Sequence, residues 1–452
     1  MTELKKSFIE NMNGMLKEEA SRFFSAMKEA PTRGIRVRSG YEGALSAFPQ
    51  DVIGAVPWAK GGFYLSAGSM AGQHPYHDMG AHYLQEPSAM APAALLMPRE
   101  GERVLDLCAA PGGKTTQLAD YMRGSGLLVA NEPVQKRALV LSRNVERMGV
   151  QNAVVISEMP QKIAECLPEF FDAVLVDAPC SGEGMFRRHP EAIAEWTEDS
   201  PRLCAERQSG ILDAAAKMLR AGGRLVYSTC TYNEIENEGT VLSFLARHED
   251  FHLAPFALEG LGTAGAGYMH IFPHKVRGEG HFMALIIKDG ESPHRAHSSG
   301  LKTPDKESAG LFQAFWRENF TSAAPAALMF GRSLLSCPAD MPPLAGLHVL
   351  RAGLTLGEIK PGRFEPSHAL ALSALSGAAK RKYEVTLPQA IACQRGESFF
   401  ADGAENGWTL LTLGGLPLMF SKCVDGQMKN HYPKGLRVSN RARDEWENDT
   451  GV

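Results

Sequence analysis

The sequence lacks the features of several large classes of protein. It contains no apolar run that approaches about 18 residues, the length that a membrane-spanning helix needs. The longest candidate, residues 89–97, is interrupted by Pro92. The N-terminus alternates apolar and charged positions and has no continuous apolar core of a secretion signal. We therefore expect a cytoplasmic protein without a membrane segment.

Motifs for metals and disulfides are also missing. The eight cysteines form no C-x-x-C pair and lack the close His and Cys spacing of structural zinc; they lie at positions 108, 166, 180, 204, 230, 337, 393 and 423. Histidines cluster at 74, 77 and 82, but Pro75 and the lack of further ligand-spaced residues favour surface or packing roles. We predict reduced thiols and no metal.

The chain has no excess of positive charge. Its net charge of −4 argues against nonspecific coating of nucleic acid, which needs many Lys and Arg, so any nucleic-acid surface must be local. The composition, with 44% hydrophobic and 22% charged residues, is typical of a soluble globular protein. A length of 452 residues suggests about three domains.

Several changes of pattern divide the chain. Residues 3–29 predict two short helices, and GIRVR and GFYL predict two strands of a small α+β N-terminal module. Short Val- and Leu-rich runs then alternate with helical stretches from residue 103 to 288, which indicates βαβ units on a mostly parallel sheet. A Gly-, Ser- and Pro-rich linker and a β-rich end follow. The expected units are 1–75, 76–288, the linker 289–306, an intermediate α+β module 307–375, and 376–452.

A glycine-rich turn, LDLCAAPGGKTT at 105–116, follows the first strand of the alternating region. A phosphate-binding P-loop is excluded because Cys108 takes the place of its first glycine, and the G-x-G-x-x-G of dinucleotide sites is absent. A nucleoside cofactor lying against the turn fits better, with Glu132 after the second strand accepting its ribose hydroxyls. The alternative is an ordinary turn and a solvated Glu.

Two later strands end in cysteine-bearing segments, VLVDAPCSGEGMFRR and GRLVYSTCTYNEIENE. Because neighbouring parallel strands end at one edge of a sheet, Asp177, Cys180 and Cys230 are expected in one pocket. A thiolate that adds to carbon 6 of cytosine makes carbon 5 nucleophilic toward a methyl sulfonium. Cys230 suits this addition. A protonated or hydrogen-bonded Asp177 suits the stabilisation of the adduct, and Cys180 suits the release of the methylated base. The alternative is that they pack as small hydrophobes, the role we prefer for Cys108 and Cys166.

At these residues the chain resembles the Fmu/Sun family of RNA (cytosine-5) methyltransferases, and within it the bacterial 16S rRNA methyltransferase F group. The matching strings are YLQEPSAM, DLCAAPGGKT, DAPCSGEGMFRR, STCTYNEIENE and FPHKVRGEGHFMALIIK. The resemblance implies a Rossmann-like methyltransferase core that uses S-adenosylmethionine. It also implies that Cys230 attacks the base, that Cys180 serves release, and that Lys114 lies near catalytic Asp177. The cofactor site would comprise Cys108, Ala109, Ala110, Pro111, Gly112, Gly113, Lys114, Glu132, Arg137 and Asp177.

The same resemblance implies RNA-contacting modules at both ends, the second PUA-like. Six basic residues oppose Asp425 alone near the C-terminus, which agrees with an RNA surface: Lys422, Lys429, Lys434, Arg437, Arg441 and Arg443. The interleaved Phe420, His431 and Tyr432 favour RNA over a solvated terminus.

Three further assignments concern single residues. Family members carry an acidic residue after the third strand that holds the adenine amine, and Glu158 is the candidate here. Arg187 and Arg188 are expected to hold phosphates beside a flipped base, or else to be solvated. Asn233 and Glu236 fit a helix-cap pattern.

The predicted function is methylation of carbon 5 of a cytosine in RNA. The expected RNA is 16S rRNA, and the expected state of the enzyme is a monomer. The alternatives are a tRNA or DNA cytosine methyltransferase and a catalytically silent RNA-binding assembly factor. In a DNA enzyme the PC-motif cysteine, Cys180, would be the nucleophile.

Overall fold

The computed structural model describes residues 4–293, 299–338 and 340–437. Its centre is a sheet in the order β10-β14-β9-β8-β5-β6-β7-β17, with β13 also paired to β14. The strands from β5 to β9 are parallel, whereas β14 and β17 run antiparallel to their neighbours. The bounds are β5 (Arg103–Asp106), β6 (Leu127–Asn131), β7 (Ala153–Ile156), β8 (Phe171–Asp177), β9 (Leu219–Thr229), β10 (Phe251–Leu253), β13 (Tyr268–Ile271), β14 (His281–Lys288) and β17 (Val349–Ala352).

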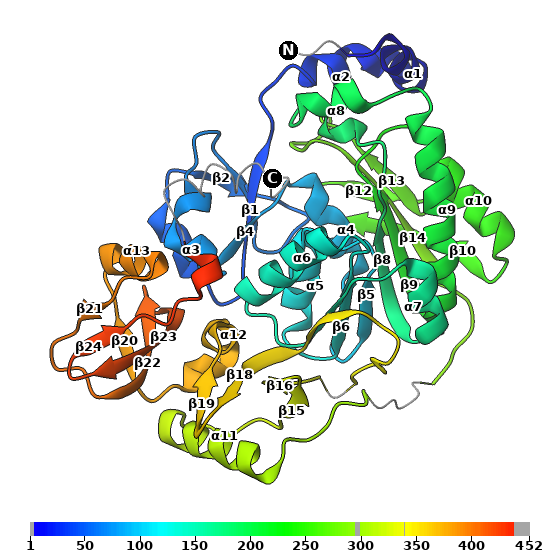
Figure 1. Cartoon of the computed structure of the whole chain (residues 1–452). Coiled ribbons are helices and arrows are strands. Elements are labelled where there is room, and N and C mark those ends of the chain that lie inside the picture. Colours follow the sequence, from blue (N-terminus) through cyan, green and yellow to red (C-terminus); the bar gives the residue numbers. More distant parts are fainter. Residues whose placement is uncertain (1–3, 294–298, 339, 438–452) are drawn as a thin grey trace.

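Helices cover both faces of this sheet (Figure 1). Successive strand residues point to opposite faces, so Val104 packs toward one helical layer and Leu105 toward the other. One layer holds α4 (Ala91–Leu96), α5 (Gly113–Met122) and α6 (Gln135–Arg147), and the other α7 (Pro160–Cys166), α9 (Ser200–Met218) and α10 (Glu238–Arg247). This arrangement confirms the predicted Rossmann-like core.

The N-terminal module braces the end of the core where β8 and β9 finish. Aromatic rings of α1 (Lys6–Leu16) and α2 (Ala20–Ala26) pack on the loop after β8, with Phe8 against Phe186 at a centroid distance of 5.1 Å. An antiparallel sheet follows in the order β2-β3-β1-β4, with β1 (Arg33–Val37), β2 (Val52–Ala55), β3 (Gly62–Leu65) and β4 (His82–Leu84). Its last strand lies beyond residue 75, where we expected the module to end.

The C-terminal half contains two further sheets. The intermediate module joins α11 (Lys306–Asn319) and α12 (His368–Leu372) to β15 (Leu328–Phe330), β16 (Ser333–Ser336), β18 (Leu354–Lys360) and β19 (Arg363–Pro366). The last module holds α13 (Leu387–Arg395) and the predicted β-rich sheet of β20 (Lys382–Glu384), β21 (Phe399–Phe400), β22 (Gly407–Leu413), β23 (Leu416–Val424) and β24 (Gln427–Lys429).

Strand β17 belongs to the intermediate module by sequence but to the core sheet by pairing. Its residues pair with β7, as Val349 with Ile156 and Ala352 with Val154. The segment before the intermediate module, residues 289–306, was expected to be a linker, and residues 294–298 of it lie outside the described residues. Within the described part of the chain, every helix is too short or too polar to span a bilayer.

Candidate active site

Two cysteines meet at the carboxyl ends of β8 and β9. These strands are parallel neighbours, with Asp177 in register with Ser228, so the segments that follow them start side by side. The sulfur atoms of Cys180 and Cys230 lie 3.2 Å apart, and both residues are half-buried. The structure therefore brings together the two cysteines that the sequence analysis placed in one pocket.

The surroundings of Cys180 favour its neutral thiol form. The hydrogen bond to Cys230 and burial raise the pKa of Cys180 well above its usual value. Cys180 is thus a neutral thiol at physiological pH and can donate its proton toward the sulfur of Cys230. A sulfur that accepts a hydrogen bond is stabilised as a thiolate, which is the nucleophilic form.

Asp177, the last residue of β8, is held by three side chains. One carboxylate oxygen accepts from Lys114 Nζ at 2.7 Å, and the other accepts from Ser228 Oγ at 2.7 Å. The ring of His281 at the start of β14 is 3.5 Å from the second oxygen. Burial alone would raise the pKa of Asp177, but Lys114 and His281 bring it well below its usual range. Of the two forms expected for this carboxyl, the structure favours the hydrogen-bonded, ionised one.

Lys114 keeps its charge beside this carboxylate. Burial opposes protonation, but the pKa of Lys114 is raised because Asp177 and Cys230 favour the ammonium form. The cation therefore lies within electrostatic reach of the candidate nucleophile and of Asp177 together.

The glycine-rich turn lies between β5 and α5, as predicted. Gly112 has a φ of +116°, a conformation that residues with a side chain rarely adopt, and it opens the helix. The carbonyl of Pro111 accepts from the Asn144 side chain at 2.9 Å, and that of Ala110 accepts from Arg137 at 3.2 Å. Two side chains of α6 thus fix the turn that would hold the cofactor.

Two buried carboxyl groups follow the neighbouring strands. Glu132 is 2% exposed, pairs with Arg137 at 3.1 Å and accepts the backbone N–H of Val134. Asp106 is fully buried, and its Oδ1 has no hydrogen-bond partner among the described residues, while burial raises its pKa to about 7. A free acceptor oxygen and a buried carboxylate beside a glycine turn fit a nucleoside cofactor that carries hydroxyl and ammonium donors.

The remaining members of the expected cofactor set lie near this turn. Cys108 packs partly against the core, and burial raises the pKa of its thiol, so it is neutral. Ala109 donates its N–H to the carbonyl of Asn131, which ties the turn to β6. Glu158, by contrast, already accepts the backbone N–H of His348 with its Oε1 at 2.7 Å.

The structure corrects the role expected for Arg187. Its side chain is 5% exposed, its Nε is 2.6 Å from a Glu279 oxygen, and it donates to the carbonyls of Ala26 and Gly278. This arginine ties the loop after β8 to α2 and to the segment before β14, so it cannot reach a phosphate. Arg188, next in sequence, is half-buried and forms no such pair among the described residues.

The stacking role expected near the C-terminus is corrected for two of its three aromatic residues, while His431 is exposed. Phe420 and Tyr432 are 5% and 4% exposed and belong to hydrophobic clusters, so neither ring offers a free stacking face. Lys422, Lys429 and Lys434 are exposed as expected. Arg441 and Arg443 lie outside the described residues.

The clustered histidines include a ring that is buried and hydrogen-bonded to the backbone. The ring of His82 is fully buried and lies 3.1 Å from the Ala71 carbonyl, and burial lowers its pKa to about 3. Among the described residues, no group of three His, Cys, Asp or Glu has the arrangement of a metal site.

Several supporting residues were missed from the sequence. Glu236 accepts from the backbone of Ser181 and the side chain of Gln208, which links the segments after both cysteines. Asn233 and Glu236 also bond each other and so have a structural role, but they do not cap a helix, because α10 begins at Glu238 and its N-cap residue is Asn237. Gly184 is required because a Cβ there would lie 2.8 Å from the Cys230 carbonyl. Ser228 and His281 could have been found from the sequence. Both are polar residues at strand ends within the segments that carry the family resemblance.

Comparison with protein families covers almost the whole chain. Residues 93–287 match the model of 16S rRNA methyltransferase RsmB/F. Residues 4–87 match the N-terminal domain of 16S rRNA methyltransferase RsmF, 314–374 the first C-terminal domain of RsmF, and 380–438 the RsmF PUA domain.

Solved structures with the same fold include a methyltransferase homolog protein from Pyrococcus horikoshii. It is 30% identical, with a TM-score of 0.54 over 63% of this chain and 95% of that one. NSun6 from Pyrococcus horikoshii, solved with SFG, has a TM-score of 0.56 over 64% of this chain and 99% of that one, and its 22% identity makes it a likeness of fold.

Curated relatives match over most of their length. Ribosomal RNA small subunit methyltransferase F of Erwinia tasmaniensis is 31% identical over 95% of this chain and 96% of that protein. The enzyme of the same name from Aeromonas hydrophila is 34% identical over 84% of this chain and 85% of that protein. On this evidence the chain belongs to the RsmB/F family of S-adenosylmethionine-dependent 16S rRNA methyltransferases.

Proposed function

We propose that this chain methylates carbon 5 of a cytosine in 16S rRNA and that Cys230 is the covalent nucleophile. The observation that carries the proposal is the contact of 3.2 Å between the sulfur atoms of Cys180 and Cys230, beside the ion pair of Lys114 and Asp177. One sulfur can attack while the other remains protonated, and a fixed carboxylate and ammonium lie close by. Activity on ribosomal RNA also implies action in the cytoplasm.

The first step is addition of the Cys230 thiolate to carbon 6 of the base. The new S–C6 bond pushes the electrons of the C5–C6 double bond toward carbon 5, which becomes nucleophilic. The neutral Cys180 thiol can donate toward the sulfur of Cys230, and the Lys114 ammonium lies within electrostatic reach of it. A hydrogen-bond donor and a nearby cation are the groups that stabilise a thiolate in proteins.

Asp177 has the role of an acceptor. Because its carboxylate is ionised and held by Lys114 and Ser228, it can accept a hydrogen bond from the exocyclic amine or the protonated ring nitrogen 3 of cytosine. Electron density in the adduct spreads toward nitrogen 3, so a proton held there stabilises the adduct. The fixed geometry of Asp177 lowers the cost of orienting this contact.

When bound, S-adenosylmethionine supplies an electrophilic methyl group on a sulfonium. The turn at 108–114 with Glu132, Arg137 and Asp177 forms the site that would hold it. Within that site Asn144 and Arg137 fix the turn through the Pro111 and Ala110 carbonyls.

Release requires loss of the carbon 5 proton and of the sulfur from carbon 6. The bond to Cys230 is the first cause of the raised pKa of Cys180. Once the Cys230 sulfur is bonded to carbon 6 it carries no charge, so Cys180 can release its own proton to solvent. The resulting thiolate of Cys180 then takes the proton from carbon 5. The C5–C6 double bond then re-forms and Cys230 leaves as a thiolate.

The test is to incubate Cys180→Ala and Cys230→Ala variants with in vitro transcribed 16S rRNA and S-adenosylmethionine. We expect Cys180→Ala to accumulate a protein–RNA adduct that resists denaturation, because attack proceeds and release fails. Cys230→Ala should form neither adduct nor 5-methylcytosine. Cys166→Ala, in the half-buried end of α7, is the matched control and should methylate as the unaltered protein does.

Two other outcomes would contradict the proposal. An adduct in Cys230→Ala but not in Cys180→Ala would assign attack to Cys180, as in DNA cytosine methyltransferases. Absence of 5-methylcytosine from naked rRNA and from small subunits alike, with the unaltered protein, would favour a silent assembly factor.

A further inference from the structure

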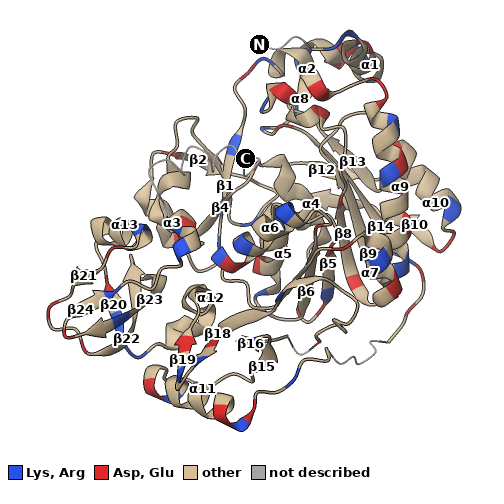
Figure 2. Cartoon of the chain, in the orientation of Figure 1, with Lys and Arg blue, Asp and Glu red and all other residues tan. Residues whose placement is uncertain are grey.

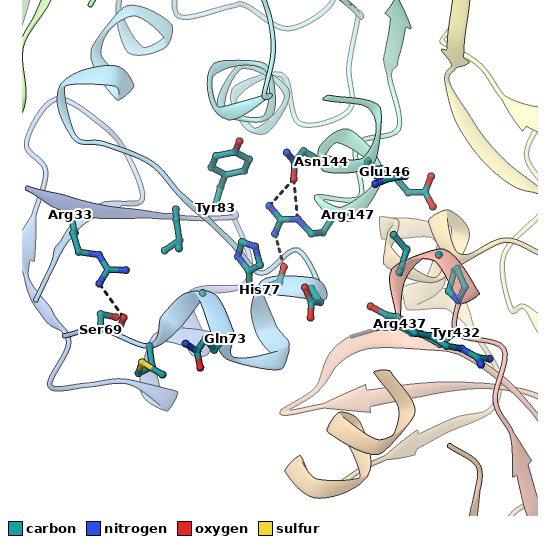
Figure 3. Close-up of a pocket in the computed structure, with 18 of the residues that line it drawn as sticks. Arg33, Ser69, Gln73, His77, Tyr83, Asn144, Glu146, Arg147, Tyr432 and Arg437 are labelled. Atoms are coloured by element: carbon teal, nitrogen blue, oxygen red, sulfur yellow. Dashed lines mark hydrogen bonds between the residues drawn. The ribbon is translucent and has the colours of Figure 1, made fainter. Parts of the chain in front are cut away.

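A large cavity lies away from the two cysteines, where the modules at both ends of the chain meet α6 (Figure 3). Its volume is about 900 Å³, at the upper end of the range of small-molecule sites, roughly 300–1,000 Å³. The N-terminal module contributes Arg33 and residues 67–70, α6 contributes Arg143 and Arg147, and the C-terminal module contributes residues 432, 433 and 435–437. The cavity therefore exists only when all three parts are assembled.

The cations of this cavity are not neutralised by carboxylates. Five arginines line it, and none forms an ion pair with a described Asp or Glu: Arg33, Arg143, Arg147, Arg188 and Arg437. Arg33 donates to the backbone carbonyls of Ala67 and Ser69, and Arg147 to those of His77 and His82. Figure 2 shows basic residues on α6, which borders the cavity.

The acidic side chains around the cavity do not balance this charge. Glu146 is paired with Arg351 of β17 and so is already neutralised, which leaves Asp78 as the other acidic lining residue. Arg437 also lines the cavity, and its guanidinium lies close to Gly396 at the end of α13. The net charge of the lining is positive, and arginine without a carboxylate partner is a typical ligand of phosphate.

One wall of the cavity leads toward the reacting cysteines. Arg188 follows Cys180 on the loop after β8, so the same loop carries a candidate catalytic thiol and a lining cation. Tyr83 and Asn144 separate the cavity from the glycine turn: a Cβ on Gly113 would lie 3.3 Å from the Tyr83 ring, and Asn144 bonds the Pro111 carbonyl. Arg188 therefore connects the loop that carries Cys180 with the lining of the cavity.

We propose that this cavity is a second RNA-binding site, which holds backbone phosphates of a single-stranded segment flanking the target cytosine through Arg143, Arg188 and Arg33. The inference rests on the proposed function for the identity of the RNA. Half-buried His77 and His368 on the walls offer ring surfaces for unpaired bases.

The test compares Arg143→Ala/Arg188→Ala with Arg317→Ala, an exposed arginine of α11 outside the cavity. Neither replaced cavity side chain has a hydrogen bond among the described residues, so folding should be unaffected. Binding of in vitro transcribed 16S rRNA is measured over a range of salt concentrations without cofactor. We expect roughly tenfold weaker binding of the double variant at low salt. The slope of log K against log salt should be shallower by about 1.4, since each single-strand phosphate contact contributes about 0.7.

A second variant separates charge from shape. Arg143→Lys/Arg188→Lys should keep most of the salt slope, because it keeps both charges. Equal affinity and slope in the double alanine variant, the Arg317→Ala control and the unaltered protein would overturn the proposal. Binding is measured without cofactor and therefore without methylation. The binding test can therefore fail while the proposed Cys230 reaction holds, and it can succeed while that reaction fails.

Discussion

The active site and the cavity between the modules differ in whether their cations are paired with carboxylates. At the active site, Lys114 is paired with Asp177, and nearby Arg187 is paired with Glu279. At the cavity, Arg188 and Arg143 have no carboxylate partner among the described residues, although Arg188 adjoins Arg187 in sequence. A cation committed to an internal carboxylate fixes geometry, whereas one that is not committed remains available to an outside anion.

The largest expected effect comes from the carboxylate at the active site. Asp177→Asn removes the anion that pairs with Lys114 and accepts from the base. We expect kcat to fall about a hundredfold to ten-thousandfold, the usual contribution of such a group. Binding of 16S rRNA should change little, because the cavity arginines are intact. Asp213→Asn replaces a half-buried carboxylate of α9 that pairs with Arg247, away from the two cysteines, and should leave kcat unchanged. Equal rates in both variants would remove Asp177 from the chemistry.

The adjacent arginines provide a sharper comparison. Arg187→Met leaves Glu279, 1% exposed, without its cation, and breaking a buried pair in this way costs about 3–5 kcal/mol of unfolding free energy. Arg188→Met should cost less than about 0.5 kcal/mol, because no partner is lost. Denaturant unfolding of the two variants measures the difference. Similar losses would mean that the two arginines are not distinguished by pairing.

The buried acid beside the glycine turn makes stability depend on pH. Burial raises the pKa of Asp106 from its usual 3.8 to about 7. The folded state therefore holds a proton that the unfolded state has lost, and stability declines as pH rises from about 4 to about 7. Asp106→Asn should stabilise the cofactor-free protein at pH 8 by up to about 4 kcal/mol, at ~1.4 kcal/mol per pH unit, and much less at pH 5. A benefit that does not depend on pH would contradict this cause.

The buried ring of His82, near the cavity, should make stability depend on pH in the opposite direction. Burial lowers the pKa of His82 from 6.5 to about 3, so the folded state keeps this ring neutral. The contribution of the neutral ring to the free energy of unfolding is complete above pH 6.5 and is lost as the pH falls toward 3. The loss is about 1.4 kcal/mol at pH 5.5. His82→Gln should remove this part of the loss between pH 7.5 and 5.5 in denaturant titrations. An unchanged pH response would mean that His82 is not the titrating group.

The sequence predicted the core well because its signals are local. Each Val- and Leu-rich run between residues 103 and 288 became a strand of the central sheet, and parallel pairing of β8 with β9 brought Cys180 to Cys230. The strings that carried the family resemblance are the same segments. Predictions based on periodicity and strand ends therefore held where neighbours in sequence are also neighbours in space.

Contacts between distant segments were not accessible in this way. Arg187 looked like a phosphate ligand because nothing local shows that Glu279, 92 residues later, faces it. Phe420 and Tyr432 looked like stacking rings because their burial depends on α11, α12 and α13 packing over them. The pairing of β17 with β7 joins residues nearly 200 apart, which no periodicity in either segment reveals.

That last pairing determines how far the protein can be shortened. Without β17, the backbone N–H and C=O groups along one side of β7 would lose their partners, and an apolar strand would become the open margin of the sheet. Open margins of this kind recruit strands from other molecules and lead to aggregation. A fragment ending at residue 288 would retain every candidate catalytic residue and would still tend to self-associate.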